Sequence, residues 1–338
     1  MLAHYAKGNY VTATSGGVKL ELIVWDDMAG YLIPDEDNLR SYSATMSSDT
    51  VELETIPPGG SFLTDLPPPI QRYPYEGIPR LLAIRETELR RQQSEWILFT
   101  GVDNQTFTRN FFNSEDKMIQ RCWTSYDRPQ NLLLVKTWAT RPHEVAHQTW
   151  EWLLFEALSR TLRRSLQLFG SAACCAESGS CKQPDLSFLP FQLPHGRTDK
   201  WPSMVVETTY PESPKLLSDA RFWLSESKGD LKMVLTINID HNVPKVTFET
   251  WILNYNGRIY RDQVVTVYKE GDDIHVRGRP LVVEFEKLFL RPSESPEETN
   301  ISFDGEMLEY IATCVWEAQR FERTQKEEEE ERGTEGKK

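Results

Sequence analysis

The chain has 338 residues, and 39% of them are hydrophobic, including 10 Trp and 15 Phe, so it can bury a sizeable core. The net charge of −13 argues against a large non-specific nucleic-acid surface but leaves room for a local basic groove. No apolar run reaches the ~20 residues that span a membrane, and residues 1–11 lack the apolar centre of a signal peptide.

The cysteines give an indication of the compartment. There are five, an odd number in a large chain, which favours a reducing environment over a disulfide framework. Cys174, Cys175 and Cys181 lie close together, but their spacing is not a standard zinc pattern, so we predict buried or loop thiols. We therefore expect an intracellular protein, cytoplasmic or nuclear, without a membrane partner.

The first 134 residues contain few clear signals. Residues 1–75 are rich in turns, acids and prolines and predict an irregular, partly disordered extension with one strand at "VKLELIVWD". Residues 76–134 form a connecting region, in which a helix is predicted from about Pro79 to Gly101. A strand follows at residues 132–138.

The region from 135 to 290 contains the strongest patterns. A long helix is predicted from Pro142 to Phe169, because apolar residues recur there at helical spacing and no glycine interrupts them. Two strand-like runs follow, one after Asp185 and one ending at Glu207. A helix after Ser213 comes next, and then four strands at residues 231–240, 245–253, 258–268 and 280–290.

The end of the chain completes the prediction. An amphipathic helix covers roughly residues 305–323 within a segment from 291 to 325, and residues 326–338 form a charged tail that we expect to be disordered. The order of helices and strands indicates a mixed α/β sheet domain, extended by C-terminal antiparallel strands and a C-terminal helix. Trp201, Trp223 and Trp251 are predicted to lie in its core.

The sequence "HEVAH", His143 to His147, matches the HExxH pattern of zinc hydrolases. In such a site two imidazoles bind zinc and the glutamate acts as a general base. Pro142 places the motif in the first turn of its helix, and Arg141 is a charge where zinc metalloproteases keep uncharged residues. A structural helix start is therefore favoured, and a zinc hydrolase is the third functional hypothesis.

Asp185 and Glu207 form the second candidate site. Carboxylates on adjacent strands can point to the same side of a sheet and hold Mg²⁺ or Mn²⁺, whose bound water can attack a phosphodiester. Two acids in this arrangement can equally be helix caps or members of surface salt bridges.

A longer pattern carries a resemblance. The segments "SYDRPQNLLLVKTWATRPHEVA", "KQPDLSFLP" and "WPSMVVETTYPESPKLLSDARFWLSESKGDLKMVLTINI" resemble, in order and spacing, a largely uncharacterised family of proteins from filamentous fungi. The corresponding region of that family is similar to the PD-(D/E)xK nucleases. The resemblance implies a restriction-endonuclease-like core, a mixed sheet flanked by helices, over residues 135–290.

The resemblance also implies roles for particular residues. Asp185 matches the acid of "PD", Glu207 matches the acid of "(D/E)xK", and Glu144 would be an additional metal-binding acid. The expected lysine is replaced by Thr209, which cannot stabilise a developing negative charge as lysine does. Lys215 on the next helix is the first candidate for that role, with Arg221 as the second.

These observations leave two leading hypotheses. The first is a Mg²⁺- or Mn²⁺-dependent phosphodiesterase acting on nucleic acid, with Asp185, Glu207 and Lys215 as the catalytic residues. The second is a catalytically inactive nuclease fold that serves as a binding module, which the substitution at Thr209 and the acidic body both favour.

Overall fold

The computed structural model describes residues 9–15, 18–24, 62–63, 66, 70–91, 95–137, 140–209, 214–254, 257–278 and 280–335. The chain divides into two units, Met1–Ser48 and Asp49–Lys338. The first unit contains an antiparallel hairpin of β1 (Asn9–Ser15) and β2 (Val18–Val24). The strand predicted from residue 18 is therefore confirmed, whereas its partner β1 was not predicted.

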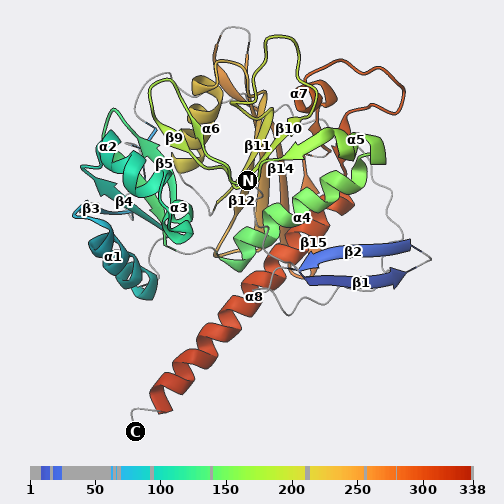
Figure 1. The fold of residues 1–338 in the computed structure, drawn as a ribbon. Coiled ribbons are helices and arrows are strands. Elements are labelled where there is room, and N and C mark those ends of the chain that lie inside the picture. Colours follow the sequence, from blue (N-terminus) through green and yellow to red (C-terminus); the bar gives the residue numbers. More distant parts are fainter. Residues whose placement is uncertain are drawn as a thin grey trace. The chain divides into compact units, whose positions relative to one another are not determined.

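The second unit is built on a mixed sheet. Among its described residues, seven strands belong to this sheet: β7 (Leu166–Leu168), β10 (Leu186–Pro190), β11 (Met204–Thr209), β12 (Met233–Ile239), β13 (Lys245–Leu253), β14 (Ile259–Glu270) and β15 (Asp273–Arg277). They are ordered β15-β14-β13-β12-β11-β10-β7 (Figure 1). Within the described strands of this sheet, only β11 and β12 pair in parallel, and α6 (Pro214–Glu226) makes the crossover that a parallel pair requires.

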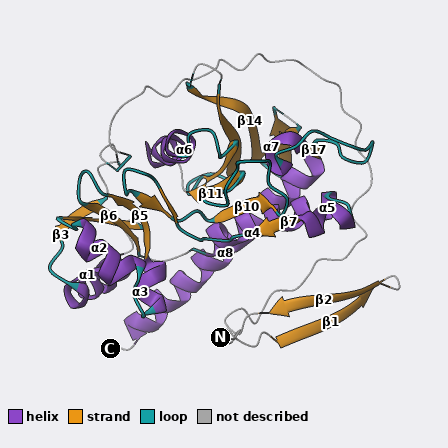
Figure 2. Cartoon of the chain, turned by 45° about the horizontal axis from the view of Figure 1, so that its top comes forward, coloured by secondary structure: helices purple, strands orange, loops and turns teal. Residues whose placement is uncertain are grey.

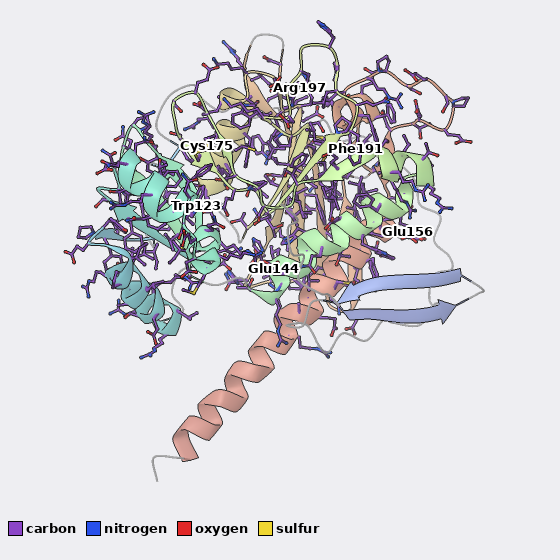
Figure 3. The ribbon with its side chains drawn as sticks, viewed as in Figure 1. Trp123, Glu144, Glu156, Cys175, Phe191 and Arg197 are labelled. Carbon is purple, nitrogen blue, oxygen red and sulfur yellow. A yellow bond between two sulfur atoms is a disulfide. The ribbon has the colours of Figure 1, made fainter. Side chains whose placement is uncertain are left out.

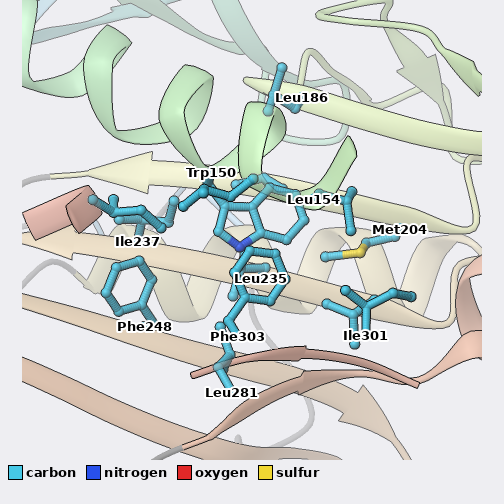
Figure 4. Close-up of a cluster of buried hydrophobic side chains, with 14 of the residues drawn as sticks. Trp150, Leu154, Leu186, Met204, Leu235, Ile237, Phe248, Leu281, Ile301 and Phe303 are labelled. Carbon is cyan, nitrogen blue, oxygen red and sulfur yellow. The ribbon is translucent and has the colours of Figure 1, made fainter. Parts of the chain in front are cut away.

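Helices cover both faces of this sheet. Alternate residues of β11 separate the two layers, because Met204 and Val206 pack with α4 (Arg141–Ala157) and α8 (Gly305–Glu335), whereas Val205 packs with α6. Figure 2 shows α4 and α6 on opposite faces of the sheet. In the α4 layer, Trp150 stacks on Phe303 with ring centroids 5.3 Å apart (Figure 4).

A second sheet precedes and partly interrupts the first in sequence. Among the described residues its strands are β3 (Gln71–Pro74), β4 (Trp96–Thr100), β5 (Trp123–Asp127), β6 (Leu132–Lys136), β8 (Cys174–Cys175) and β9 (Cys181–Lys182). Their order is β3-β4-β6-β5-β9-β8. The associated helical elements are α1 (Ile78–Arg91), α2 (Asn104–Phe107), the π-helical stretch η2 (Thr108–Phe112) and α3 (Lys117–Cys122).

The two sheets share one hydrophobic cluster. Trp96 and Leu98 of β4 pack in the same cluster as Val205 of β11 and Trp223 of α6. The β8–β9 hairpin completes the second sheet and leads directly into the segment before β10. The chain therefore passes from one sheet to the other at Lys182, immediately before Asp185.

Several sequence predictions are confirmed. β6, β10, β11, α6, β12, β13 and β14 lie where strands and a helix were predicted. Trp201, Trp223 and Trp251 are buried, as expected of core residues. The mixed α/β class is also confirmed, and among the described residues no helix is both long and apolar enough to cross a bilayer.

The helix predicted from Pro142 to Phe169 is wrong in its second half. α4 ends before Leu158, whose backbone is extended, and a new helix α5 (Arg160–Ser165) begins after Ser159. Ser159 caps this helix by accepting a hydrogen bond from the backbone N–H of Leu162. Leu166–Leu168 then forms β7, which pairs with β10. The apolar spacing did not reveal the break, because Leu158, Leu162 and Leu166 are buried on both sides of it.

Three other boundaries differ from the prediction. The helix expected to reach Gly101 ends at Arg91, and the apolar run from Trp96 forms β4. The strand predicted at residues 280–290 is limited to β16 (Leu281–Val283), which pairs with β17 (Ile301–Phe303), and α7 (Phe285–Phe289) follows it. α8 continues to Glu335, well into the tail expected to be disordered.

The cysteines also differ from the prediction. Cys175 and Cys181 form a disulfide across the β8–β9 hairpin, with their Cα atoms 4.1 Å apart. Figure 3 labels Cys175 in this hairpin. Cys174 is a buried free thiol, as predicted. Strand pairing brings Cys175 directly opposite Cys181, which their six-residue separation in sequence did not make evident.

Candidate active site

The register of β10 and β11 brings the two predicted acids together. Leu186 pairs with Val206, so the antiparallel alignment places Asp185 opposite Glu207. Their side chains contact different helices, because Asp185 reaches His143 on α4 and Glu207 reaches Trp223 on α6. Thr208 also donates its backbone N–H to Asp185 Oδ2 at 2.7 Å, which holds the start of β10 against the end of β11.

Asp185 lies between a backbone donor and an imidazole. His143 Nε2 on α4 is 3.2 Å from Asp185 Oδ2, and Lys136 Nζ at the end of β6 is 3.4 Å from the same nitrogen. Burial opposes ionisation of the aspartate, but the charge and hydrogen bond of His143 outweigh it and hold the pKa of Asp185 well below its usual range. The Asp185 side chain is 18% exposed, so this ionised carboxylate can be reached from solvent.

Glu207 has a different environment. Its Oε1 accepts a hydrogen bond from Trp223 Nε1 at 2.6 Å and lies 3.2 Å from Lys182 Nζ. Burial raises the pKa of Glu207 to about 7, and nearby Asp219 and Asp185 add to the effect while Lys182 opposes it. These two neighbouring acids therefore differ in protonation, with Asp185 ionised and Glu207 close to its midpoint at neutral pH.

Two buried lysines lie beside Glu207 and the nearby Asp219. Lys182 is 1% exposed and bridges Glu207 and Asp219, with its Nζ 3.0 Å from Asp219 Oδ1. Lys215 Nζ is 2.5 Å from Asp219 Oδ2 and 4.4 Å from the centre of the Trp96 ring. The structure thus brings Lys215 into the same buried cluster and not onto a solvated helix surface, but its ion-pair partner in that cluster is Asp219.

Thr209 occupies the position where the resemblance calls for lysine. It is buried at the end of β11, and β11 itself contains no lysine or arginine. Lys182 instead supplies an ammonium group to Glu207 from β9. This lysine stands only three residues before Asp185 in the sequence, and that proximity to the "PD" motif was the signal that could have identified it.

The HEVAH segment lies in the first turns of α4, which Thr140 caps by accepting the N–H of His143. Glu144 is not adjacent to the acid pair, because the ring of His143 separates it from Asp185. Its Oε1 lies 3.3 Å from His143 Nδ1 and its Oε2 lies 3.4 Å from His147 Nε2. Burial opposes ionisation, but the two imidazoles hold the pKa of Glu144 below its usual range.

Glu95 is a further carboxyl group that the sequence did not single out. It directly precedes β4, is 8% exposed, and has a buried Oε1 without a hydrogen-bond partner. Burial raises its pKa to about 7, against the opposing charges of His143 and Lys136. Nothing in the local sequence distinguishes Glu95 from other charged residues, because its burial depends on the packing of the two sheets.

Comparisons with known proteins add little to this geometry. No family model and no curated protein matches the sequence. One similar solved structure is described as a putative nuclease belonging to DUF820 from Anabaena variabilis, at 13% identity and a TM-score of 0.31. The match covers 57% of this chain and 90% of that one. At this identity and TM-score, the similarity carries no argument about function.

Proposed function

We propose that this protein is a divalent-metal-dependent phosphodiesterase that cleaves nucleic acid, with a restriction-endonuclease-like core. The observation that carries the proposal is the placement of Asp185, directly before β10, beside the end of β11 that carries Glu207, with the ammonium of Lys182 3.2 Å from Glu207. These are the strand positions that the PD-(D/E)xK resemblance assigns to the two acids. The acids and the lysine come from three different segments: the residue before β10, β11 and β9.

The donor set suits a magnesium or manganese ion. Such ions prefer carboxylate oxygens and retain several waters, so two protein carboxylates are sufficient ligands. Asp185 is ionised and partly exposed, and Glu207, with its pKa of about 7, needs only a nearby cation to favour its charged form. A cation bound there supplies a nucleophilic water at neutral pH and neutralises charge on the phosphate.

The lysine role is best filled by Lys182. Negative charge develops on the phosphate during hydrolysis, and a preorganised ammonium group in a water-poor site stabilises it strongly. Lys182 is fixed by Glu207 and Asp219, so it needs little reorganisation. Lys215 reaches Asp219 from the opposite side and holds that acid in place, which makes it a positioning residue in this proposal.

The test combines calorimetry with a cleavage assay. Mn²⁺ is titrated into wild type, D185N and E207Q, and the same proteins are incubated with labelled single- and double-stranded DNA and RNA. We expect one binding event and cleavage in wild type, with cleavage reduced at least 100-fold in both variants. D273N is the matched control, because Asp273 is exposed on β15 and lies outside the acid pair. Cleavage that survives in D185N and E207Q contradicts the proposal.

An inactive binding module is the second candidate, and one observation favours it. Glu207 and Asp219 are already balanced by Lys182 and Lys215 in a buried network, and Trp223 satisfies Glu207 Oε1. A network of this kind can be purely structural. It predicts no heat with Mn²⁺ and no cleavage, but nucleic-acid binding by fluorescence anisotropy that persists in EDTA.

A further inference from the structure

Three side chains at the start of α4 converge on one point. One ligand atom from each of His143, Glu144 and His147 lies within 4.8 Å of the other two. The imidazole rings are 5.3 Å apart and nearly perpendicular, at 83°, so their nitrogens face a common space without stacking. Figure 3 labels Glu144 at this end of α4.

The distances between these atoms match those of ligands on a single ion. Zinc binds imidazole nitrogen and carboxylate oxygen at about 2.0–2.2 Å in a tetrahedral arrangement, so neighbouring ligand atoms lie about 3.4 Å apart. Glu144 Oε1 is 3.3 Å from His143 Nδ1, and Glu144 Oε2 is 3.4 Å from His147 Nε2. Each separation matches a tetrahedral edge, and since they involve different oxygens of Glu144, one of these oxygens is the ligand and the other lies beside the second imidazole.

His143 offers a second and independent observation. The side chain is fully buried, and within the described part of the chain its Nδ1 makes no hydrogen bond. The nearest polar neighbour of this nitrogen is Glu144 Oε1, an ion pair at 3.3 Å without hydrogen-bond geometry, and a metal ion shared by the two atoms would satisfy both. His147 is 7% exposed, whereas Glu144 is 37% exposed and leaves the cluster open to solvent on one side.

The opposite nitrogen of His143 has the partner that a metal-binding histidine usually has. Asp185 Oδ2 lies 3.2 Å from Nε2, and a carboxylate can only accept a hydrogen bond, so the proton belongs on Nε2. Lys136 Nζ lies 3.4 Å from the same nitrogen and is the more distant of the two neighbours. A metal ion at Nδ1 takes the place of the proton that this nitrogen carries in the charged ring, while the proton on Nε2 stays hydrogen-bonded to Asp185, which orients the ring.

We propose that His143, Glu144 and His147 form a binding site for a divalent transition metal of the zinc class, with Asp185 as its outer hydrogen-bonding partner. Two imidazoles and one carboxylate favour such ions over Mg²⁺, which prefers oxygen ligands alone. The site is distinct from the Asp185–Glu207 pair and does not depend on phosphodiesterase activity. Asp185 connects the two, because it faces Glu207 on one side and His143 on the other.

This arrangement differs from the HExxH zinc hydrolase hypothesis. There the glutamate acts as a general base and the two histidines bind the metal. Here both oxygens of Glu144 face the two imidazoles, so the glutamate is itself a ligand. In this site, three residues from the first two turns of α4 bind the metal. The remaining coordination position is left to water.

The experiment measures metal binding by the full chain. The protein is stripped with EDTA and dialysed against buffered Zn²⁺, and the bound zinc is quantified by atomic emission. Co²⁺ is titrated in parallel, because its visible absorption reports nitrogen ligands and low coordination number. We expect one equivalent of zinc in wild type and a rise in Tm on zinc addition.

Variants then assign the site. H147N is expected to lose the equivalent of zinc, and D185N to weaken binding 10- to 100-fold as outer-shell changes do. E207Q keeps the zinc while losing the Mn²⁺ binding proposed for the acid pair, so the two proposals can fail separately. H195N is the control, because His195 is exposed and outside the cluster.

Two results overturn the inference. One is a wild-type protein that takes up no zinc. The other is zinc binding that H147N leaves unchanged. Should H147N fail to fold, as judged by far-ultraviolet circular dichroism, E144Q carries the same test, because the more exposed Glu144 side chain tolerates substitution.

Discussion

Lys182 Nζ lies 3.2 Å from Glu207 Oε1, although the two residues stand on strands of different sheets. The β8–β9 hairpin of the second sheet presents the lysine to the end of β11 in the first. The acid pair and its cation thus depend on the packing between the sheets. This relationship connects the proposed chemistry to the stability of the whole second unit.

Removing the Lys182 ammonium should be strongly destabilising. K182M leaves Glu207 and Asp219 close together and buried without their shared cation, and breaking a buried pair in this way costs about 3–5 kcal/mol. Urea denaturation of wild type and K182M at pH 8 measures the difference.

A double substitution separates the charge effect from packing. K182M/E207Q removes one charge of each sign, so it should recover part of the loss, and the cycle gives the coupling between the two residues. K228M is the control, because Lys228 pairs with Glu177 on the exposed surface. If the stability losses of K182M and E207Q simply add in the double variant, the two residues are not coupled and the ion pair is contradicted.

Much of the fold was predictable because its signals are local. β12 and β13 are continuous apolar or alternating runs, and α6 has its apolar face and a proline at its start. The second sheet was missed because its strands are short and come from distant segments, with β8 and β9 inserted some 40 residues after β6.

The candidate site, too, was predictable only where its signals are local. Asp185 and Glu207 were proposed from motif and spacing, and the pairing of Leu186 with Val206 places them beside each other on the chain segments of β10 and β11. Glu95 could not be ranked from sequence, because an isolated glutamate is ordinarily exposed, and for Lys182 the one signal was its position three residues before Asp185. Their burial follows from contacts between the two sheets, which no local pattern encodes.

The break between α4 and α5 gives a prediction about a single hydroxyl group. Ser159 Oγ accepts the N–H of Leu162, and replacing such a cap by alanine costs about 1 kcal/mol. S159A should lower the free energy of unfolding by that amount, measured by urea denaturation. S159D keeps an acceptor at the cap and should retain the stability. An equal loss in S159D would show that the hydroxyl acts in another way.

The disulfide gives a prediction about redox conditions. The cross-link between Cys175 and Cys181 closes a short loop. Because it restricts the unfolded chain, it contributes about 2 kcal/mol to the free energy of unfolding. C175S should therefore lose about 2 kcal/mol of stability, and dithiothreitol should lower wild type to the same level while leaving C175S unchanged. C314S is the control, because Cys314 is a free thiol on α8. Reductant-insensitive stability in wild type would contradict the disulfide in solution.

Glu95 gives a prediction about pH. Burial raises its folded pKa to about 7 from the usual 4.5, so the folded state holds this proton more tightly than the unfolded state does. The folded protein is therefore favoured below about pH 4.5, and this contribution is lost as pH rises to 7. The full difference is at most about 3 kcal/mol, taking 1.36 kcal/mol for each pKa unit.

E95Q tests this directly, because glutamine has a similar shape and no titratable group. The free energy of unfolding is measured by urea denaturation from pH 5 to pH 8 for both proteins. E95Q should gain stability relative to wild type across this range, with most of the gain between pH 5 and pH 7. E86Q is the control, since Glu86 is an exposed residue of the same helix-and-strand region and pairs with Arg90 at the surface. A constant difference between E95Q and wild type at every pH would mean that Glu95 titrates as it does in the unfolded chain, and that its unpartnered Oε1 is hydrated rather than buried.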